Sequence, residues 1–170
     1  MAIIDGIQIS FIIPVYNAEK VLGRAVESII GADDEQIDIE IIIIENGSID
    51  NTWKICEQLA KEYTSVKCFQ SNKGVSCARN KGIRVAKGDW LVFVDADDYL
   101  ATDAVKTIKH DIRAEIADLL FYGYESGKRV INIRKIVGQE RITEENIEAC
   151  RVMMLGNPTL CMQVWAKVFR

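Results

Sequence analysis

Short apolar runs alternate with amphipathic stretches through residues 8–114, and this alternation constrains the fold more than any other feature of the sequence. The apolar runs occupy 8–15, 39–44, 66–69 and 90–94, and the second contains only isoleucine apart from Glu40. Apolar runs of this length are typical of strands that are covered on both faces. Helical periodicity follows at 21–30, 53–60, 76–86 and 102–114. The alternation predicts an α/β domain with a mostly parallel central sheet and helices on both faces.

Local signals predict where these elements begin and end. Pro14 is expected to end the hydrogen-bond ladder of the first strand, because proline has no backbone N–H. Asn17 is expected to cap the first helix, and Ser48 or Asp50 the second. Farther along the chain, strands that could pair are predicted at 119–124 and 129–136, and a helix at 144–155. Residues 161–169 fit either a strand or a helix.

Composition excludes several classes of protein. The 170 residues fit one domain, and 21 basic against 25 acidic residues give a net charge of −4. Nucleic-acid binding leaves a basic footprint, so we expect no nucleic-acid partner. The five cysteines show no CxxC spacing, which favours reduced thiols over disulfides or a zinc site. No apolar run is long enough for a membrane span and no signal-peptide pattern is present, so we expect a cytoplasmic protein, at the inner face of the membrane if parts outside this chain anchor it.

Polar residues follow three of the predicted strands, at 16–17, 45–46 and 95–97. Ligands of open α/β sheets bind outside the carboxyl ends of the strands, so the three segments are candidates for one site. The acidic segment 95–98 is the strongest signal, because closely spaced carboxylates repel one another unless a cation or solvent relieves them. Mg²⁺ and Mn²⁺ prefer oxygen ligands of this kind. Capping of the following helix by Asp97 or Asp98 explains the segment equally well when it is taken alone.

Neither a P-loop nor a glycine-rich dinucleotide fingerprint is present. A phosphate bound by this chain would therefore be neutralised by a metal ion, by Lys73 or Arg79, or by helix N-termini.

Four segments in order resemble the motifs of family 2 glycosyltransferases, which have the GT-A fold. They are 9–19 (ISFIIPVYNAE), 44–52 (IENGSIDNT), 72–82 (NKGVSCARNKG) and 88–100 (GDWLVFVDADDYL), the last with the family's Asp-x-Asp motif. Residues 165–167 resemble a weaker tryptophan–lysine segment seen later in many members. The resemblance implies a Rossmann-like three-layer sandwich that transfers a sugar from a nucleotide-diphosphate sugar, typically a UDP-sugar, to an acceptor hydroxyl.

The resemblance also implies the site and its partners. Tyr16 is expected against the base, and Asn46 occupies the place where the family has an acidic residue that accepts from uracil N3–H. Asp97, assisted by Asp95, is expected to bind Mn²⁺ or Mg²⁺. The acceptor would be a saccharide or lipid-linked saccharide, in cell-surface polysaccharide or glycolipid synthesis, with inversion at the anomeric carbon. The full predicted substrate-binding set is Pro14, Val15, Tyr16, Asn17, Glu19, Glu45, Asn46, Gly74, Arg79, Asp95, Ala96 and Asp97.

The resemblance implies a single GT-A domain over 1–170, with a nucleotide-binding half at 1–100 and the start of an acceptor-side half at 101–170. In inverting members the catalytic base follows the tryptophan–lysine segment, so it is expected beyond Arg170, in a domain truncated at its C-terminus. A nucleotide-sugar-binding module without turnover is the alternative. A sugar nucleotidyltransferase is disfavoured, because no glycine-rich basic loop follows the first strand.

Overall fold

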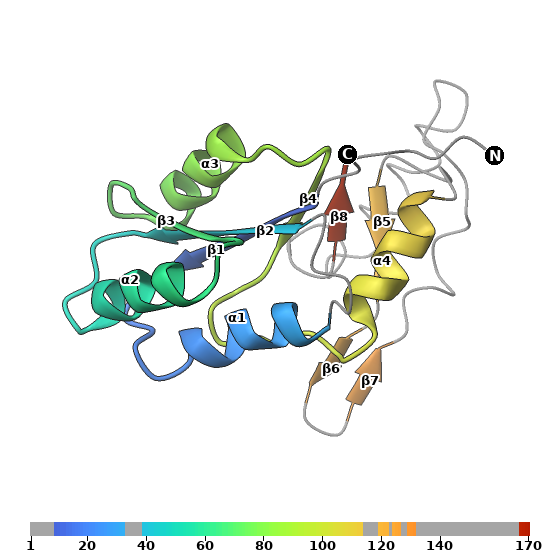
Figure 1. The fold of residues 1–170 in the computed structure, drawn as a ribbon, viewed down its shortest axis with the longest axis horizontal. Helices are drawn as coiled ribbons and strands as arrows, with labels where there is room; N and C mark the ends of the chain where they lie inside the picture. The colour runs from blue at the N-terminus through green and yellow to red at the C-terminus, as the bar shows by residue number, and fades with distance from the viewer. Residues whose placement is uncertain (1–8, 33–38, 114–118, 123, 127–128, 132–166) are drawn as a thin grey trace.

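The computed structural model describes residues 9–32, 39–113, 119–122, 124–126, 129–131 and 167–170 (Figure 1). The helices are α1 (Leu22–Gly31), α2 (Thr52–Glu62), α3 (Val75–Val85) and α4 (Ala104–Arg113). The strands are β1 (Ile9–Val15), β2 (Ile39–Glu45), β3 (Val66–Gln70), β4 (Trp90–Phe93), β5 (Leu119–Phe121), β6 (Tyr124–Ser126), β7 (Arg129–Ile131) and β8 (Lys167–Phe169). Within the described helices, none is long and apolar enough to cross a membrane.

Six of the strands form one sheet in the order β3-β2-β1-β4-β8-β5. β1 pairs in parallel with β2 and with β4, and β2 pairs in parallel with β3. β8 lies antiparallel between β4 and β5, and β6 and β7 form a separate antiparallel hairpin. The predicted mostly parallel sheet is confirmed, with β8 as the strand that runs against it.

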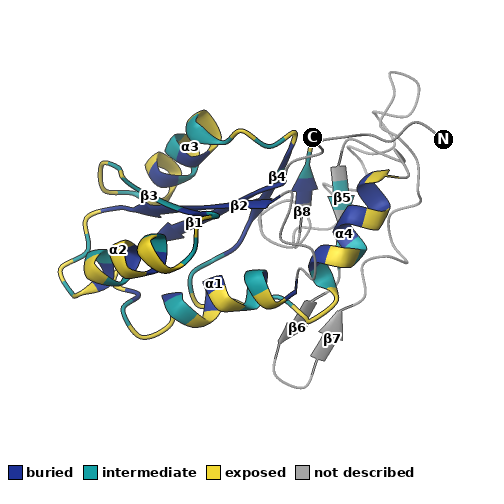
Figure 2. Ribbon diagram, viewed as in Figure 1, coloured by how far each residue is buried: buried dark blue, intermediate teal, exposed yellow. Residues whose placement is uncertain are grey.

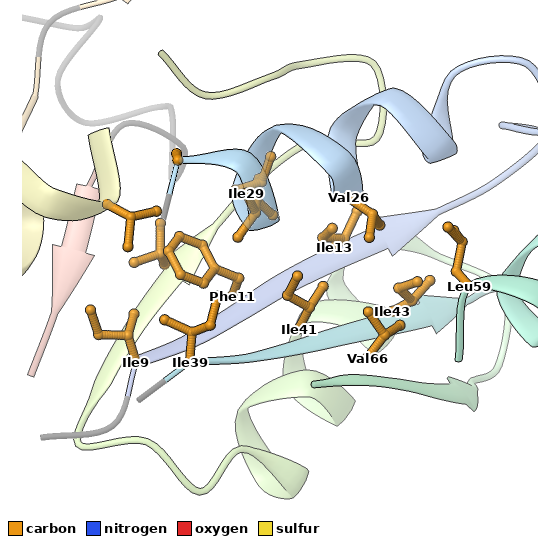
Figure 3. Close-up of a cluster of buried hydrophobic side chains, with 14 of the residues drawn as sticks. Ile9, Phe11, Ile13, Val26, Ile29, Ile39, Ile41, Ile43, Leu59 and Val66 are labelled. Atoms are coloured by element: carbon orange, nitrogen blue, oxygen red, sulfur yellow. The ribbon is translucent and has the colours of Figure 1, made fainter. Parts of the chain in front are cut away.

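Side chains alternate between the two faces of the central strands, and each face is covered by helices. Ile9, Phe11 and Ile13 of β1 pack with Ile41 and Ile43 of β2 on the face that α1 and α2 cover (Figure 3). The opposite residues of β2, Ile42 and Ile44, pack with Ala78 of α3. Figure 1 shows α3 on the other side of the sheet from α1 and α2. The central strands are buried throughout while the helices keep an exposed face (Figure 2), so the predicted three-layer architecture is confirmed.

Gly82 allows α3 to lie directly on the sheet. A Cβ atom at this position would lie 2.4 Å from Cγ2 of Ile12 in β1, closer than carbon atoms can approach. Glycine weakens a helix interior by about 1 kcal/mol relative to alanine, so packing against β1 explains why it is tolerated here.

Pro14 ends the ladder of β1 on one side only. Pairing of β1 with β4 stops at Ile12 opposite Phe93, but pairing with β2 continues through Pro14 to Val15. The Ile12 carbonyl accepts from the N–H of Val94, so Pro14, two residues on, faces the same side, where β4 has already ended. The missing N–H therefore costs no hydrogen bond of the sheet. The prediction that Pro14 ends the hydrogen-bond ladder is wrong for the pairing with β2, which continues to Val15.

The prediction that Asn17 caps the first helix is also wrong. Helix α1 begins at Leu22 after Val21, and Asn17 has a φ of 50° in the loop before it. The N-cap of α2 is Asn51, so neither Ser48 nor Asp50 occupies the predicted cap position, although Asp50 Oδ1 accepts from the N–H of Thr52, the first residue of α2 (3.0 Å).

The predicted strand at 119–124 is divided in the structure, with β5 ending at Phe121 and β6 beginning at Tyr124. The predicted pairing with the strand at 129–136 is made by β6 and β7, while β5 pairs with β8. Lys167–Phe169 resolves the open choice at the end of 161–169 in favour of a strand. The predicted helix at 144–155 lies outside the described residues.

A buried polar network ties the amino ends of the central strands together. Glu40 is 2% exposed; its Oε1 accepts from Ser10 Oγ (2.7 Å) and the Lys87 N–H (2.6 Å), and its Oε2 from Lys67 Nζ (2.8 Å). Ser10 Oγ also accepts from the N–H of Gly88 (2.9 Å). Burial alone would raise the pKa of Glu40, but the bonds from Lys67, Lys87 and Ser10 outweigh it and lower the pKa.

Candidate functional site at the carboxyl ends of β1, β2 and β4

The sheet has its topological switch point between β1 and β4. From β1 the chain proceeds through α1 and α2 toward β3 on one side, and then returns through α3 on the opposite face to β4 on the other side of β1. In open α/β sheets, ligands bind in the crevice that this reversal creates outside the carboxyl ends of the strands. Tyr16 directly follows β1, and Asp95 follows β4 after Val94. The switch point therefore brings two of the predicted site segments together.

The loops that follow β1 and β2 are joined by hydrogen bonds from backbone N–H groups to side-chain oxygens. The N–H of Asn17 donates to Ser48 Oγ (3.0 Å), and Asn17 Oδ1 accepts from the N–H of Ile49 (2.9 Å). The next N–H, of Ala18, donates to Oγ1 of the fully buried Thr52 (2.7 Å). These bonds hold the loop after β1 in one conformation. Asn17, a predicted substrate-binding residue, makes two of them.

Glu19, also predicted to bind substrate, extends this contact. Its N–H donates to Asp50 Oδ2 (3.3 Å), and its Oε2 accepts from the N–H and from Nδ2 of Asn51 (2.9 and 3.0 Å). The hydroxyl of Thr52 lowers the pKa of Asp50, a carboxylate held by this network. The side chain of Glu19 therefore positions the second loop.

Glu45 and Asn46 lie at the end of β2, and both are 5% exposed. Glu45 Oε1 accepts from the N–H of Ser48, which closes the turn that contains Gly47 at a φ of 88°. Asn46 Nδ2 donates to the Val15 carbonyl (3.0 Å), and Asn46 Oδ1 accepts from the N–H of Gly74 (3.1 Å). The Asn46 amide thus joins the ends of β1 and β2 to the start of α3.

Tyr16 is an exposed aromatic residue at this edge of the sheet, with 43% of its surface accessible. The ammonium of Lys73, in the loop before α3, lies over its ring at 5.1 Å from the centroid. Pro14 and Val15 are buried within β1, so their side chains lie beneath the site rather than in it. Gly74, with a φ of 126°, begins α3 beside Lys73.

The acidic segment after β4 forms an ion pair with Arg79 of helix α3. Arg79 Nη2 of α3 donates to Asp95 Oδ1 at 3.1 Å, and both side chains are about a quarter to a third exposed. Arg79 Nε is buried and has no hydrogen-bond partner among the described residues. Asp97 is exposed, and Asp98 donates its N–H to the Asp95 carbonyl (3.0 Å) in a turn that also contains Ala96. Desolvation, with the carboxylates of Asp97 and Asp95, raises the pKa of Asp98.

Asp95 and Asp97 have the right donor chemistry for Mg²⁺ or Mn²⁺, which typically use one or two carboxylates together with substrate phosphates. The described residues contain no group of three acidic, histidine or cysteine side chains arranged around one point. A metal ion bound by Asp95 and Asp97 would therefore take its remaining ligands from substrate and water. Burial is the main cause of the raised pKa of Asp98, and the repulsion from Asp97 and Asp95 that adds to it is of the kind that a cation relieves.

Helix α1 contacts the residues that directly follow the acidic segment, and the sequence did not predict this contact. Ser28 Oγ accepts from the N–H of Leu100 (3.0 Å) and donates to the Ala25 carbonyl (2.7 Å). The Arg24 guanidinium lies 3.8 Å from the ring centroid of Tyr99. No local signal identifies these partners, because Ser28 and Leu100 are 72 positions apart.

Comparison with known proteins decides the family. The family model described as Glycosyl transferase family 2 matches residues 10–153. The chain belongs to glycosyl transferase family 2. The resemblance stated from the four motifs is thereby confirmed.

Relatives within family 2 match parts of longer proteins. Glycosyltransferase GlyG of Streptococcus pneumoniae serotype 4 is 34% identical over 122 residues, which cover 69% of this chain and 40% of the relative. Poly(ribitol-phosphate) beta-glucosyltransferase of Bacillus spizizenii is 34% identical over 101 residues, 58% of this chain and 16% of the relative. The chain thus spans less than half the length of each of these curated relatives.

Solved structures confirm the GT-A fold. Staphylococcus aureus TarS 1–349 in complex with UDP superposes with a TM-score of 0.66 at 26% identity, over 72% of this chain and 37% of that one. TarS 1–349 in complex with UDP-GlcNAc gives a TM-score of 0.75 at 22% identity, over 96% of this chain and 45% of that one.

Proposed function

We propose that the chain provides the donor-binding part of an inverting, metal-dependent glycosyltransferase that takes its sugar from a UDP-sugar. The observation that carries the proposal is the Arg79–Asp95 ion pair at the switch point of the sheet, with Asp97 exposed in the same segment and Tyr16 directly after the neighbouring strand β1. An aromatic ring suits a base, and carboxylates suit a cation that binds diphosphate. The TarS structure with UDP supports the choice of nucleotide.

In this proposal residues 1–100 bind the donor and residues 101–170 begin the acceptor side of a single domain. The acceptor is a hydroxyl of a saccharide or lipid-linked saccharide, in cell-surface polysaccharide or glycolipid synthesis on the cytoplasmic side of the membrane. The Bacillus spizizenii relative, named as a transferase acting on poly(ribitol-phosphate), supports a cell-surface acceptor. The catalytic base remains unassigned.

Each site residue has a distinct task. Tyr16 stacks on the base. Asn46 keeps the base pocket in shape through Val15 and Gly74, and the second hydrogen of its amide and the second lone pair of its oxygen remain to meet a base edge. Asp97 binds Mn²⁺ or Mg²⁺ with help from Asp95, which is paired with Arg79. When bound, the cation neutralises the charge that develops on the leaving diphosphate.

Calorimetric titration of UDP in the presence of Mn²⁺ or of a chelator tests this proposal. Wild-type protein is expected to bind UDP more tightly with Mn²⁺, and Asp97→Asn is expected to lose that difference. Glu57→Gln is the matched control, because it removes one carboxylate charge from the exposed surface of α2. Metal dependence that survives in Asp97→Asn would refute the assignment of Asp97.

The alternative function is a module that binds the nucleotide sugar without turnover. Both functions predict the same UDP titration, so an assay of UDP release from UDP-sugars separates them. UDP release that saturates with a saccharide acceptor identifies a transferase. Tight donor binding without UDP release identifies a binding module.

A further inference from the structure

Lys73 and Tyr16 meet across the opening of the candidate site. The two residues come from different loops, one before α3 and one after β1, and the Lys73 ammonium lies over the Tyr16 ring at 5.1 Å from the centroid. Both side chains are exposed. The ring that the proposed function assigns to the base is therefore covered by a cation in this structure.

The backbone on either side of this contact is held in place. The N–H of Gly74, the residue after Lys73, donates to Asn46 Oδ1 (3.1 Å), and a Cβ on Gly47 would lie in ordinary van der Waals contact with the Lys73 Cβ, at 3.8 Å. The loop of Lys73 is thus fixed against the end of β2, while its four-carbon side chain remains free to turn about its own bonds.

Lys73 also differs from the other cation of the site. Arg79 is paired with Asp95, whereas none of the salt bridges among the described residues involves Lys73. An ammonium group offers three donors and no acceptor, so phosphate oxygens are far stronger partners for it than the face of an exposed ring. A base and an ammonium cannot occupy the same face of one ring at the same time.

We propose that Lys73 is a donor-binding residue that covers the Tyr16 ring in the free protein and transfers to the diphosphate when the base stacks on that ring. The inference rests on the proposed nucleotide site and adds to it a residue that, besides the metal-binding carboxylates, distinguishes a nucleoside diphosphate from a nucleoside. Lys73 contributes through charge, so its contribution falls as ionic strength rises.

Separate titrations of uridine and of UDP with Mn²⁺ test the inference, because only UDP carries the phosphates. Lys73→Gln is expected to weaken UDP binding roughly tenfold, the lower end of the range for a hydrogen bond to a charged group, and to leave uridine binding unchanged or tighter. Lys73→Arg is expected to restore most of the UDP affinity, and the dependence of UDP binding on salt is expected to be shallower in Lys73→Gln.

Lys61→Gln provides the matched control, because it removes the same charge from the exposed last turn of α2. Equal losses of uridine and UDP affinity in Lys73→Gln would place Lys73 on the base and overturn the inference, as would UDP affinity equal to that of the wild type. These outcomes leave the nucleotide site intact. A wild-type chain that binds neither uridine nor UDP would instead refute the proposed function, and the inference with it.

Discussion

Replacement of Asn46 by aspartate separates the structural use of this side chain from its proposed use in base recognition. In the structure Asn46 is 5% exposed, Nδ2 donates to the Val15 carbonyl at 3.0 Å, and Oδ1 accepts from the Gly74 N–H at 3.1 Å. Asn46→Asp keeps the acceptor for Gly74 but places a second carboxylate oxygen where the donor was. That oxygen faces the Val15 carbonyl, so two acceptors meet in a buried position.

The magnitude follows from these contacts. Leaving a buried acceptor pair unmatched costs about 1–3 kcal/mol, and each unit by which the pKa of the new carboxyl rises adds about 1.4 kcal/mol when it is ionised. We expect Asn46→Asp to lose about 2–3 kcal/mol of unfolding free energy at pH 7.5. At low pH the protonated carboxyl can donate to Val15, so the loss should be smaller there.

The sign of the pH dependence is fixed by the direction of this shift. The folded-state pKa of the new carboxyl is raised above its unfolded value of about 3.9, because the ionised form is buried beside a carbonyl. The destabilisation is therefore smallest below pH ~4 and grows as the pH rises through the unfolded pKa to the folded one.

Urea unfolding followed by tryptophan fluorescence at pH 4.5 and 7.5 measures the effect. With an m-value of about 2 kcal/mol/M, a loss of 2 kcal/mol lowers the midpoint by about 1 M. Asn80→Asp, on the exposed surface of α3, is the control and should leave the midpoint nearly unchanged. Equal midpoints for Asn46→Asp and the wild type at both pH values would refute the structural role of the amide.

Three further predictions concern stability and nucleotide binding. Gly82→Ala should destabilise the protein by about 1–3 kcal/mol because its Cβ meets Ile12, whereas Gly23→Ala, with open space around it, should stabilise α1 by up to about 1 kcal/mol; equal effects on the urea midpoint would contradict the packing argument. The folded protein lowers the pKa of Glu40, so the stability that Glu40 contributes is present above its unfolded pKa and is lost as the pH falls through its folded pKa. Glu40→Gln should therefore make the unfolding free energy depend less steeply on pH in the acidic range. An unchanged dependence would count against the hydrogen-bond network around Glu40. Tyr16→Ala should weaken UDP binding by about 1–3 kcal/mol while Tyr16→Phe, which keeps the ring, should not; calorimetry that finds both variants equal would remove Tyr16 from the base pocket.

Local pattern was sufficient for the elements of the first hundred residues. The apolar run at 39–44 predicted a buried strand, and β2 is buried at every position, because strands covered on both faces must be apolar whatever their neighbours are. The four motif segments likewise identified the family, since each lies within one continuous stretch. Signals that depend on a neighbouring strand failed, as at Pro14, whose missing N–H faces the side on which β4 has already ended, while pairing with β2 continues.

The partners of the site side chains were decided by the tertiary structure. Asn46 and Glu19 were predicted from sequence as substrate-binding residues, yet their side chains join loops that only the sheet order brings together. Arg79 meets Asp95 because α3 crosses to the opposite face before β4 begins, and Ser28 meets Leu100 across 72 positions of chain. The sequence determines which polar side chains the protein has and the spacing of apolar residues within each segment. Which of two polar groups faces the other depends on strand order and on the face each helix covers, and those follow from the packing of the whole sheet.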